Sequence, residues 1–305
     1  MISTLGENMK KLLFIFNPWS GKARVKDHLF EISDEFTKAG YLVTTYPTQR
    51  MSDCYNFIKN NGNNYDIIVC SGGDGTLNET VAGVLDGNCD NVLLGYIPTG
   101  STNDFATSLL IPKTVSRAVQ NIIYGTEYKC DVGCFNGRWF NYVAAFGAFT
   151  DVSYATPQTL KNALGHQAYV IESLKSFANL KPYKIKVRTR DLEIEDSFLY
   201  GMVSNSKSVG GMKFLSGKNV VLNDGYFEVV LIGSPKNPLE FQELVNGLLF
   251  QEHNSIVRHI KCDEISFYSE ENVSWVLDGE FGGEQKEVNI SVKQNKVTYL
   301  LEKHP

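Results

Sequence analysis

The chain has 305 residues, of which 43% are hydrophobic and 21% are charged, and its formal net charge at pH 7 is −5. This length suggests about two domains, and the composition is that of a globular protein with enough apolar residues for two cores. The acidic balance excludes general nucleic-acid binding, which requires a basic surface. No apolar run approaches the roughly 18 residues of a membrane span. The apolar run at 12–16 is also too short for the core of a signal peptide, so we expect a cytoplasmic protein.

Strands and helices alternate from residue 9 to about residue 125. Strands separated by helical crossovers form a parallel, layered α/β sheet, which predicts an α/β domain over residues 9–128. Ligands bind such sheets at the carboxyl ends of the strands. The predicted strands are 11–16, 41–46, 66–70 and 92–97, and the predicted helices cover 25–39, 52–62, the segment after Thr76 and the segment after Thr114.

The hydrophobic period changes to two from about residue 129. Turn signals such as Asn136-Gly137 and Asp224-Gly225 separate short strands. This pattern predicts an antiparallel β-sandwich over 129–295, interrupted by one helix at about 159–180. The last predicted strand could return to either domain, so residues 296–305 could complete the first one.

The most informative stretch is Gly72-Gly73-Asp74-Gly75-Thr76, between a buried strand and a helix. Its glycines let a phosphate approach the main chain, and a helix N-terminus offers unpaired N–H groups. A carboxylate and a phosphate about 4 Å apart repel by roughly 4 kcal/mol at an effective dielectric near 20. Asp74 therefore predicts an intervening Mg²⁺. The alternative is a tight hairpin turn, but a helical pattern follows where a hairpin requires a second strand.

Two further loops, Asn17–Lys22 and Pro98–Asp104, follow the first and fourth predicted strands. Each could also be a plain capped turn, and Thr48 could be an ordinary loop hydroxyl. Three such loops at one edge of a sheet nevertheless favour a nucleotide site. The chain has neither Gly-x-x-x-x-Gly-Lys-Ser/Thr nor a helix-opening Gly-x-Gly-x-x-Gly, which excludes a P-loop enzyme and a dinucleotide-binding fold.

Two features of the second half have simple structural explanations. Asp278-Gly279-Glu280 offers two carboxylates, one of which could accept a proton from an acceptor hydroxyl, although a hairpin turn explains the same residues. The basic alternation over 184–190 could face an anionic membrane. The acidic alternation over 191–195 favours instead a hairpin that pairs opposite charges across strands.

Together these motifs resemble the diacylglycerol kinase catalytic family, which includes sphingosine kinases, ceramide kinases and bacterial lipid kinases. Gly-Gly-Asp-Gly alone is shared with NAD kinases and phosphofructokinases. Its combination with Thr-Gly-Ser-Thr-Asn-Asp-Phe and the late Asp-Gly-Glu is specific to lipid kinases. The resemblance covers nearly the whole chain from Met9 and rests on residues 17–21, 72–79, 98–105, 223–226 and 278–280.

The resemblance implies a two-domain kinase that moves the γ-phosphoryl group of ATP to a lipid hydroxyl, with diacylglycerol as the first candidate. It implies that Asp74 organises the catalytic Mg²⁺, and that Glu280 is the general base, supported by Asp278. The ATP site would lie between the domains, lined by Asn17, Pro18, Trp19, Ser20, Gly21, Thr48, Gly72, Gly73, Asp74, Gly75, Thr76, Leu77, Asn78 and Ser101.

The resemblance also implies a structural Mg²⁺ held by Asp224 and the backbone oxygens of Val221 and Tyr226. Relatives often carry Asp-Asp-Gly where this chain has Asn223-Asp224-Gly225, one charge fewer. A homodimer that works peripherally at the inner membrane face is expected, with no nucleic-acid partner. The alternatives are a phosphotransferase similar to NAD kinases that acts on a soluble hydroxyl, and a non-catalytic lipid- or nucleotide-binding regulator.

Overall fold

The computed structural model describes residues 9–20, 24–147, 181–207, 209, 220–250 and 254–305. The chain divides into two compact units, the first formed by residues 1–132 with 293–305 and the second by residues 133–292. Strands β5 (Thr126–Phe135) and β13 (Glu280–Leu301) contribute to both units. The domain boundary predicted at residue 128 therefore falls inside a continuous strand.

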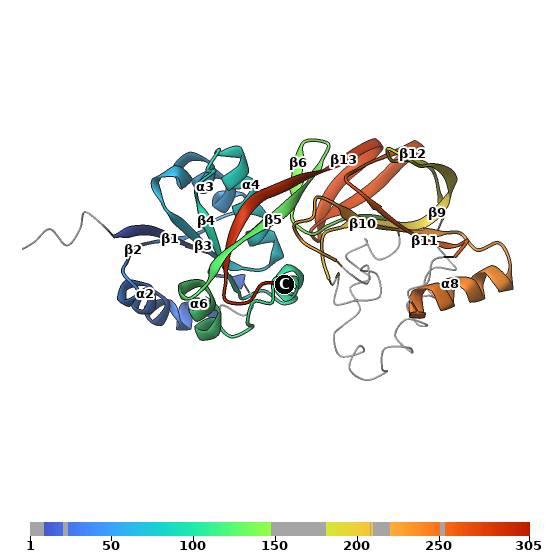
Figure 1. Cartoon of the computed structure of the whole chain (residues 1–305). Coiled ribbons are helices and arrows are strands. Elements are labelled where there is room, and N and C mark those ends of the chain that lie inside the picture. Colours follow the sequence, from blue (N-terminus) through green and yellow to red (C-terminus); the bar gives the residue numbers. More distant parts are fainter. Residues whose placement is uncertain (1–8, 21–23, 148–180, 208, 210–219, 251–253) are drawn as a thin grey trace, which may run out of the picture. The chain divides into compact units, whose positions relative to one another are not determined.

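The first unit is built on a parallel sheet with the strand order β2-β1-β3-β4-β13 (Figure 1). The interior strands β1 and β3 are almost wholly apolar, as expected where helices cover both faces of a parallel sheet. The end of β13 returns here and pairs Thr298 with Leu93. The strands are β1 (Lys10–Phe16), β2 (Tyr41–Pro47), β3 (Ile67–Gly72) and β4 (Leu93–Pro98).

Helices cover both faces of this sheet. Helices α3 and α4 pack together on one face, and α2 and α6 pack together on the other (Figure 1). Each helix buries an apolar stripe, as α2 does with Ile32 and Phe36. The helices are α1 (Arg24–Asp27), α2 (Leu29–Lys38), α3 (Asp53–Asn61), the 3-10 turn η2 (Gly62–Asn64), α4 (Asp74–Asp86), α5 (Asp104–Ser108) and α6 (Val115–Ile123).

The second unit is antiparallel, with the strand order β11-β10-β9-β7-β12-β13. Helix α8 (Pro238–Phe250) connects β10 to β11, and β6 forms a hairpin with β5. Asn136 and Gly137 in that hairpin turn both have positive φ, as a two-residue type I′ turn requires. The strands are β6 (Arg138–Phe140), β7 (Val143–Gly147), β8 (Tyr183–Arg188), β9 (Glu193–Ser204), β10 (Phe227–Gly233), β11 (Val257–Cys262) and β12 (Glu264–Leu277).

Strand β8 continues the line of β7 between β9 and β12. On the β9 side, Gly147 at the end of β7 lies opposite Tyr200, and Tyr183 at the start of β8 lies opposite Phe198. The same two strands also pair with successive stretches of β12. Residues 148–182 connect β7 to β8 in the sequence. The helix predicted at 159–180 belongs to this intervening chain and lies outside the described residues.

The core of the second unit is aromatic. Phe135, Phe146 and Phe267 surround Trp275, with ring centroids 4.9 to 5.1 Å from the indole. Tilted and edge-to-face contacts at these distances add to the free energy gained by burying the rings. The alternating burial along β12 shows why this half of the sequence has a period of two.

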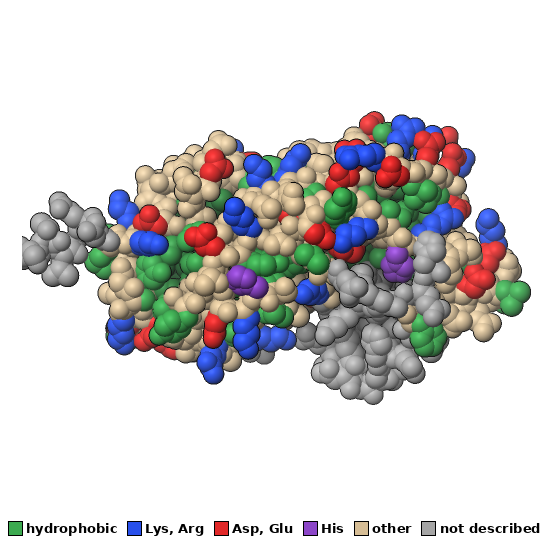
Figure 2. Space-filling model, in the orientation of Figure 1, with side chains coloured by type: hydrophobic (Ala, Val, Ile, Leu, Met, Phe, Trp, Pro, Cys, Tyr) green, Lys and Arg blue, Asp and Glu red, His purple; other side chains and the backbone are tan. Residues whose placement is uncertain are grey.

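The predicted hairpin that pairs basic with acidic side chains across two strands is confirmed. Lys184 pairs with Glu195 at 3.1 Å, and Lys186 pairs with Glu193 at 2.6 Å, across β8 and β9. Basic and acidic side chains are intermixed over the strands of this unit on the face shown in Figure 2. Among the described residues, the structure contains no helix that is long and apolar enough to cross a membrane.

Candidate active site

Four neighbouring strands of the first unit end together, and the predicted loops leave this edge. The Asn17 N–H donates to Ser71 O at 3.0 Å, the Thr48 N–H to Phe16 O at 2.9 Å, and the Thr99 N–H to Gly72 O at 2.9 Å. Backbone hydrogen bonds thus tie the loops that follow β1, β2 and β4 to the ends of the neighbouring strands β3 and β1. The parallel topology brings together segments that are far apart in the sequence.

Two of these loops touch backbone to backbone because glycine occupies both. A Cβ atom on Gly100 would overlap the Cα of Gly73, and one on Gly72 would overlap the side chain of Thr76. The position of Gly73 differs, because a Cβ there would make only an ordinary 3.5 Å contact with Gly100. Packing within the unit therefore explains Gly72 and Gly100. A ligand approaching the main chain would explain Gly73.

Asn103 and Tyr96 fix the second of these loops, and sequence reasoning gave them no such role. Asn103 has a left-handed backbone, and its amide bonds both the N–H and the C=O of Gly100 at 3.0 and 2.8 Å. The Tyr96 hydroxyl lies 3.2 Å from both Gly72 O and Asn103 Oδ1. Burial, with a smaller contribution from the charge of Asp74, raises the pKa of Tyr96 well above its usual value. The hydroxyl consequently remains a donor.

Asp74 joins the glycine loop to helix α5. Its carboxylate accepts the N–H groups of Asp104 at 3.1 Å and Phe105 at 3.3 Å. It thereby caps a helix whose own N-cap residue, Asn103, makes no side-chain cap hydrogen bond. A carboxylate can accept about four hydrogen bonds, so capping α5 does not by itself exclude a metal-bound water at Asp74. The residues around Asp74 fit the predicted catalytic Mg²⁺.

Helix α4 points its N-terminus at the same loop. Gly73 is its N-cap and provides no side-chain hydrogen bond, so the first-turn N–H groups have no cap from that side chain. The helix has 13 residues, and its dipole favours an anion at this end. The loop can therefore hold a phosphate group through main-chain donors.

The other predicted nucleotide-site residues differ in what they offer. Trp19 is 77% exposed with the Lys26 ammonium 4.1 Å from its ring centroid, whereas Leu77 is buried in the core. Thr48 is buried and its hydroxyl bonds Phe16 O. A ligand could therefore reach the Trp19 ring but not the Leu77 side chain. Pro18, Ser20, Gly75, Thr76 and Asn78 are partly exposed, Ser101 is exposed, and Gly21 lies outside the described residues.

Asp278 lies in the hairpin turn between β12 and β13, and Glu280 directly follows that turn. The two side chains differ in exposure and in hydrogen bonding. Asp278 is 4% exposed, with a positive φ, and its carboxylate accepts three backbone N–H groups. The donors are Asn141 at 2.6 Å and Tyr142 and Val143 at 3.0 Å each. The Glu280 side chain is exposed and makes no hydrogen bond or ion pair within the described part of the chain. The geometry suits Asp278 to positioning the turn and Glu280 to receiving a proton.

Asn141 is another residue that sequence reasoning missed. It is 2% exposed, and both polar atoms of its side-chain amide are buried with no hydrogen-bond partner in the described part of the chain. Its N–H makes the shortest of the three bonds to Asp278. A buried amide without partners is unusual, and nothing in the local sequence marks it.

The turn at Asp224 does not fit the predicted structural metal. Asp224 Oδ1 accepts the Tyr226 N–H at 3.1 Å, and Oδ2 accepts the Lys261 ammonium at 2.6 Å. A cationic side chain therefore already occupies the carboxylate that was expected to bind Mg²⁺. Over the described residues, no group of three or more His, Cys, Asp or Glu side chains could hold a metal ion.

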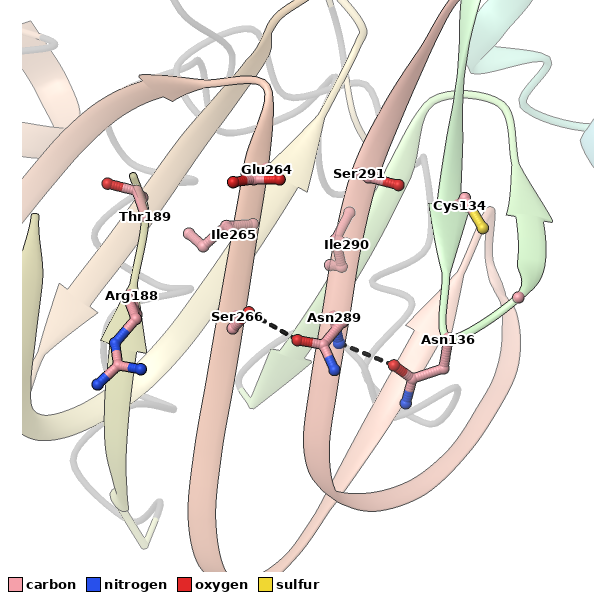
Figure 3. Close-up of a pocket in the computed structure, with 11 residues that line it drawn as sticks. Cys134, Asn136, Arg188, Thr189, Glu264, Ile265, Ser266, Asn289, Ile290 and Ser291 are labelled. Carbon is pink, nitrogen blue, oxygen red and sulfur yellow. Dashed lines mark hydrogen bonds between the residues drawn. The ribbon is translucent and has the colours of Figure 1, made fainter. Parts of the chain in front are cut away.

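A separate cavity of about 400 Å³ lies on the second unit (Figure 3). Its polar lining is internally hydrogen-bonded: Ser266 donates to Asn289 Oδ1 at 2.6 Å, and the Asn289 N–H donates to Asn136 Oδ1 at 2.8 Å. Arg188, at its margin, is paired with Glu193. None of the residues predicted for catalysis or nucleotide binding lines this cavity.

A parallel α/β unit with a glycine-rich loop before a helix N-terminus, continued by a β-rich unit with an exposed carboxylate after a turn, fits a phosphotransferase that lacks a lysine-tipped phosphate loop. Comparison with known proteins identifies the family. Residues 11–135 match the model of the diacylglycerol kinase catalytic domain. The chain is 32% identical to the diacylglycerol kinase of Bacillus subtilis (strain 168), over 90% of this chain and 91% of the relative. It is also 32% identical to the diacylglycerol kinase of Staphylococcus aureus (strain MRSA252), over 90% of this chain and 87% of the relative.

Solved structures show the same fold. A putative diacylglycerol kinase from Bacillus anthracis str. Sterne matches 97% of this chain and 98% of its own, with a TM-score of 0.80 at 23% identity. The chain belongs to the diacylglycerol kinase family, and it is a lipid kinase. ATP as the co-substrate follows from membership of this kinase family.

Proposed function

We propose that this lipid kinase transfers the γ-phosphoryl group of ATP to the hydroxyl of diacylglycerol and so forms phosphatidic acid. The similar proteins from Bacillus subtilis and Staphylococcus aureus, both diacylglycerol kinases, support this acceptor. The observation that carries the proposal is the edge of the first unit. There, a two-glycine turn, a helix N-terminus and a carboxylate are fixed together by backbone hydrogen bonds.

The first unit supplies the nucleotide side of the reaction. Main-chain N–H groups over 72–76 hold the phosphates, and the exposed Trp19 ring and the loop at Ser101 extend the contact surface. Asp74 would hold the catalytic Mg²⁺ while it caps α5. When bound, the ion neutralises charge on the phosphates as the phosphoryl group moves. Fixed donors at the developing charge are expected to supply most of the rate enhancement.

The second unit supplies the base. The Glu280 carboxylate takes the proton from the lipid hydroxyl as that oxygen attacks the γ-phosphorus, and ADP leaves. Asp278 does not touch the reacting atoms. It anchors the turn through the three N–H groups at the start of β7 and thereby fixes where Glu280 lies.

We also propose the finer architecture and the assembly that the sequence predicts. The β-rich unit is an antiparallel sandwich, and the chain works as a homodimer bound peripherally to the inner membrane face. A lipid substrate supports membrane contact, because its hydroxyl lies at the bilayer surface. Light scattering of the purified protein tests the dimer, and sedimentation with phospholipid vesicles tests the membrane contact.

One assay separates the candidate activities. Radiolabelled ATP is offered with detergent-dispersed diacylglycerol, with sphingosine, with ceramide and with NAD in parallel reactions. We expect label in phosphatidic acid. Label in NADP instead would identify a phosphotransferase for soluble hydroxyls, and nucleotide binding with no label in any product would identify a non-catalytic regulator.

A further inference from the structure

Two carboxylates and one ammonium group form a compact cluster in the second unit. Asp224 lies in the turn before β10, Glu228 is on β10, and Lys261 is directly opposite Glu228 on β11. The Lys261 ammonium lies 2.6 Å from Asp224 Oδ2 and 3.6 Å from Glu228 Oε1. It also lies 5.8 Å from the ring centroid of Tyr226, within the range of a cation–π contact.

The cluster is shielded from water to different degrees. The side chains of Glu228, Asp224 and Lys261 are 12%, 25% and 47% exposed. The second Glu228 oxygen, Oε2, is buried and has no hydrogen-bond partner among the residues that the structure describes. Mostly buried carboxylates that lie beside the same ammonium group are stabilised by that cation, because burial weakens the screening by water. Lys261 supplies that cation.

Among the described residues, the oxygen donors at this turn do not suit a divalent ion. Mg²⁺ demands near-octahedral oxygen ligands and enters poorly solvated sites reluctantly. At Asp224 one carboxylate oxygen faces the Tyr226 N–H and the other faces the ammonium. A divalent ion at the same carboxylate would be repelled by Lys261, and Asn223 contributes no compensating negative charge.

We propose that the Lys261 ammonium holds the turn 223–226 against β10 and β11 in place of a divalent cation. The second unit of this chain then folds without a structural metal. The dependence of the protein on Mg²⁺ is restricted to nucleotide chemistry at the first unit. This proposal does not rest on the acceptor lipid or on the catalytic roles of Asp74 and Glu280.

Thermal unfolding of the full chain without nucleotide tests the proposal. We expect the wild-type melting temperature to be the same in EDTA and in millimolar MgCl₂. Lys261→Met keeps most of the side-chain volume and removes the charge, and it should lower the melting temperature by about 4 °C. MgCl₂ should then restore part of the loss, because the mutation leaves two adjacent carboxylates without a cation.

Two controls make the result specific. Lys184→Met removes a lysine that pairs with Glu195 where both side chains are mostly exposed, and it should shift the melting temperature by no more than about 1 °C. Repeating the MgCl₂ titration in an Asp74→Asn background removes any contribution from the first unit. Lys261→Arg keeps the charge and should behave as the wild type.

Two outcomes would overturn the proposal. One is a melting temperature of the wild type that rises in MgCl₂, if the rise persists in the Asp74→Asn background and disappears when Asp224→Asn is added. The other is a Lys261→Met variant as stable as the wild type. If Lys261→Met does not fold, the comparison of wild type with Asp224→Asn still decides the question, because it needs no substitution of the lysine.

Discussion

Asp74 accepts a hydrogen bond from the backbone N–H of Asp104, thirty positions further along the chain. The residue that most strongly predicts a metal in the sequence is thus also the cap of a short helix in the next loop. One carboxylate links the glycine loop of β3 to the loop after β4. The proposed metal role and the stability of α5 consequently depend on the same side chain, and the choice of substitution must separate them.

Asp74→Asn and Asp74→Ala should differ in stability but not in turnover. The asparagine keeps one of the two oxygens that accept from the α5 N–H groups, whereas the alanine removes both and with them the cap, at a cost of about 1 kcal/mol. Both lose the charge that would hold the metal, so both should reduce phosphoryl transfer by at least about 100-fold. Initial rates with radiolabelled ATP and melting curves measure the two effects. An Asp74→Asn variant with normal turnover would remove the metal role.

Glu280→Gln should abolish most of the activity and leave stability unchanged. The side chain is exposed and has no partner among the described residues, so its neutral isostere costs the fold nothing. Loss of a general base reduces turnover by about 100- to 10,000-fold. Glu284→Gln, an exposed carboxylate further along β13, is the matched control and should retain its rate. Equal rates for Glu280→Gln and Glu284→Gln would contradict the role of Glu280 as the general base.

Asp278→Asn should destabilise the second unit. Three backbone N–H groups point at the carboxylate, and an amide offers one acceptor oxygen and places its own N–H₂ against these donors. Hydrogen bonds to a charged group contribute roughly 1.5 to 3 kcal/mol each, so we expect a loss of several kcal/mol in the free energy of unfolding. Urea denaturation measures it. A variant as stable as Glu280→Gln would show that the three bonds do not hold the turn.

Gly100→Ala should destabilise the fold, whereas Gly73→Ala should weaken ATP binding. Gly100→Ala overlaps the Cα of Gly73 and should destabilise the first unit by about 1 to 3 kcal/mol. Gly73→Ala makes only an ordinary contact, so the fold should remain intact while the Cβ obstructs the phosphate. We expect the dissociation constant for ATP, measured by calorimetry, to rise at least about tenfold, equal to 1.4 kcal/mol. Unchanged ATP affinity in Gly73→Ala would place the phosphates elsewhere.

Glu228 should make stability depend on pH. Burial, opposed by Lys261 and reinforced by Asp224, raises the pKa of Glu228 from 4.5 to about 7. Between these values the folded state binds a proton that the unfolded state has released, so the free energy of unfolding falls as pH rises. Urea denaturation across this range should show the decline in the wild type and a flatter profile in Glu228→Gln. Identical profiles would indicate that Glu228 titrates normally.

The sequence determined the local structure and the edge at which the loops gather. The helical period of 25–39 predicted one helix, which the structure divides at His28 into α1 and α2, and the apolar run at 67–70 predicted a strand buried on both faces. Since parallel strands with helical crossovers all end at one edge, the meeting of the loops after β1, β3 and β4 followed from element order alone. The pairing of Lys184 with Glu195 followed likewise, because charges alternating at the strand period must face each other in a hairpin.

Tertiary structure decided which side chains complete the sites. Asp278 meets the N–H of Asn141, 137 positions away, and Lys261 reaches Asp224 across β10 and β11. Periodicity reports which face of a strand is buried, but not the register that sets two distant strands side by side. The same limit applies to β8, which continues the line of β7 only because both fit between β9 and β12. The catalytic motifs are local patterns that a sequence displays, whereas the groups that hold them in place come from long-range strand pairing.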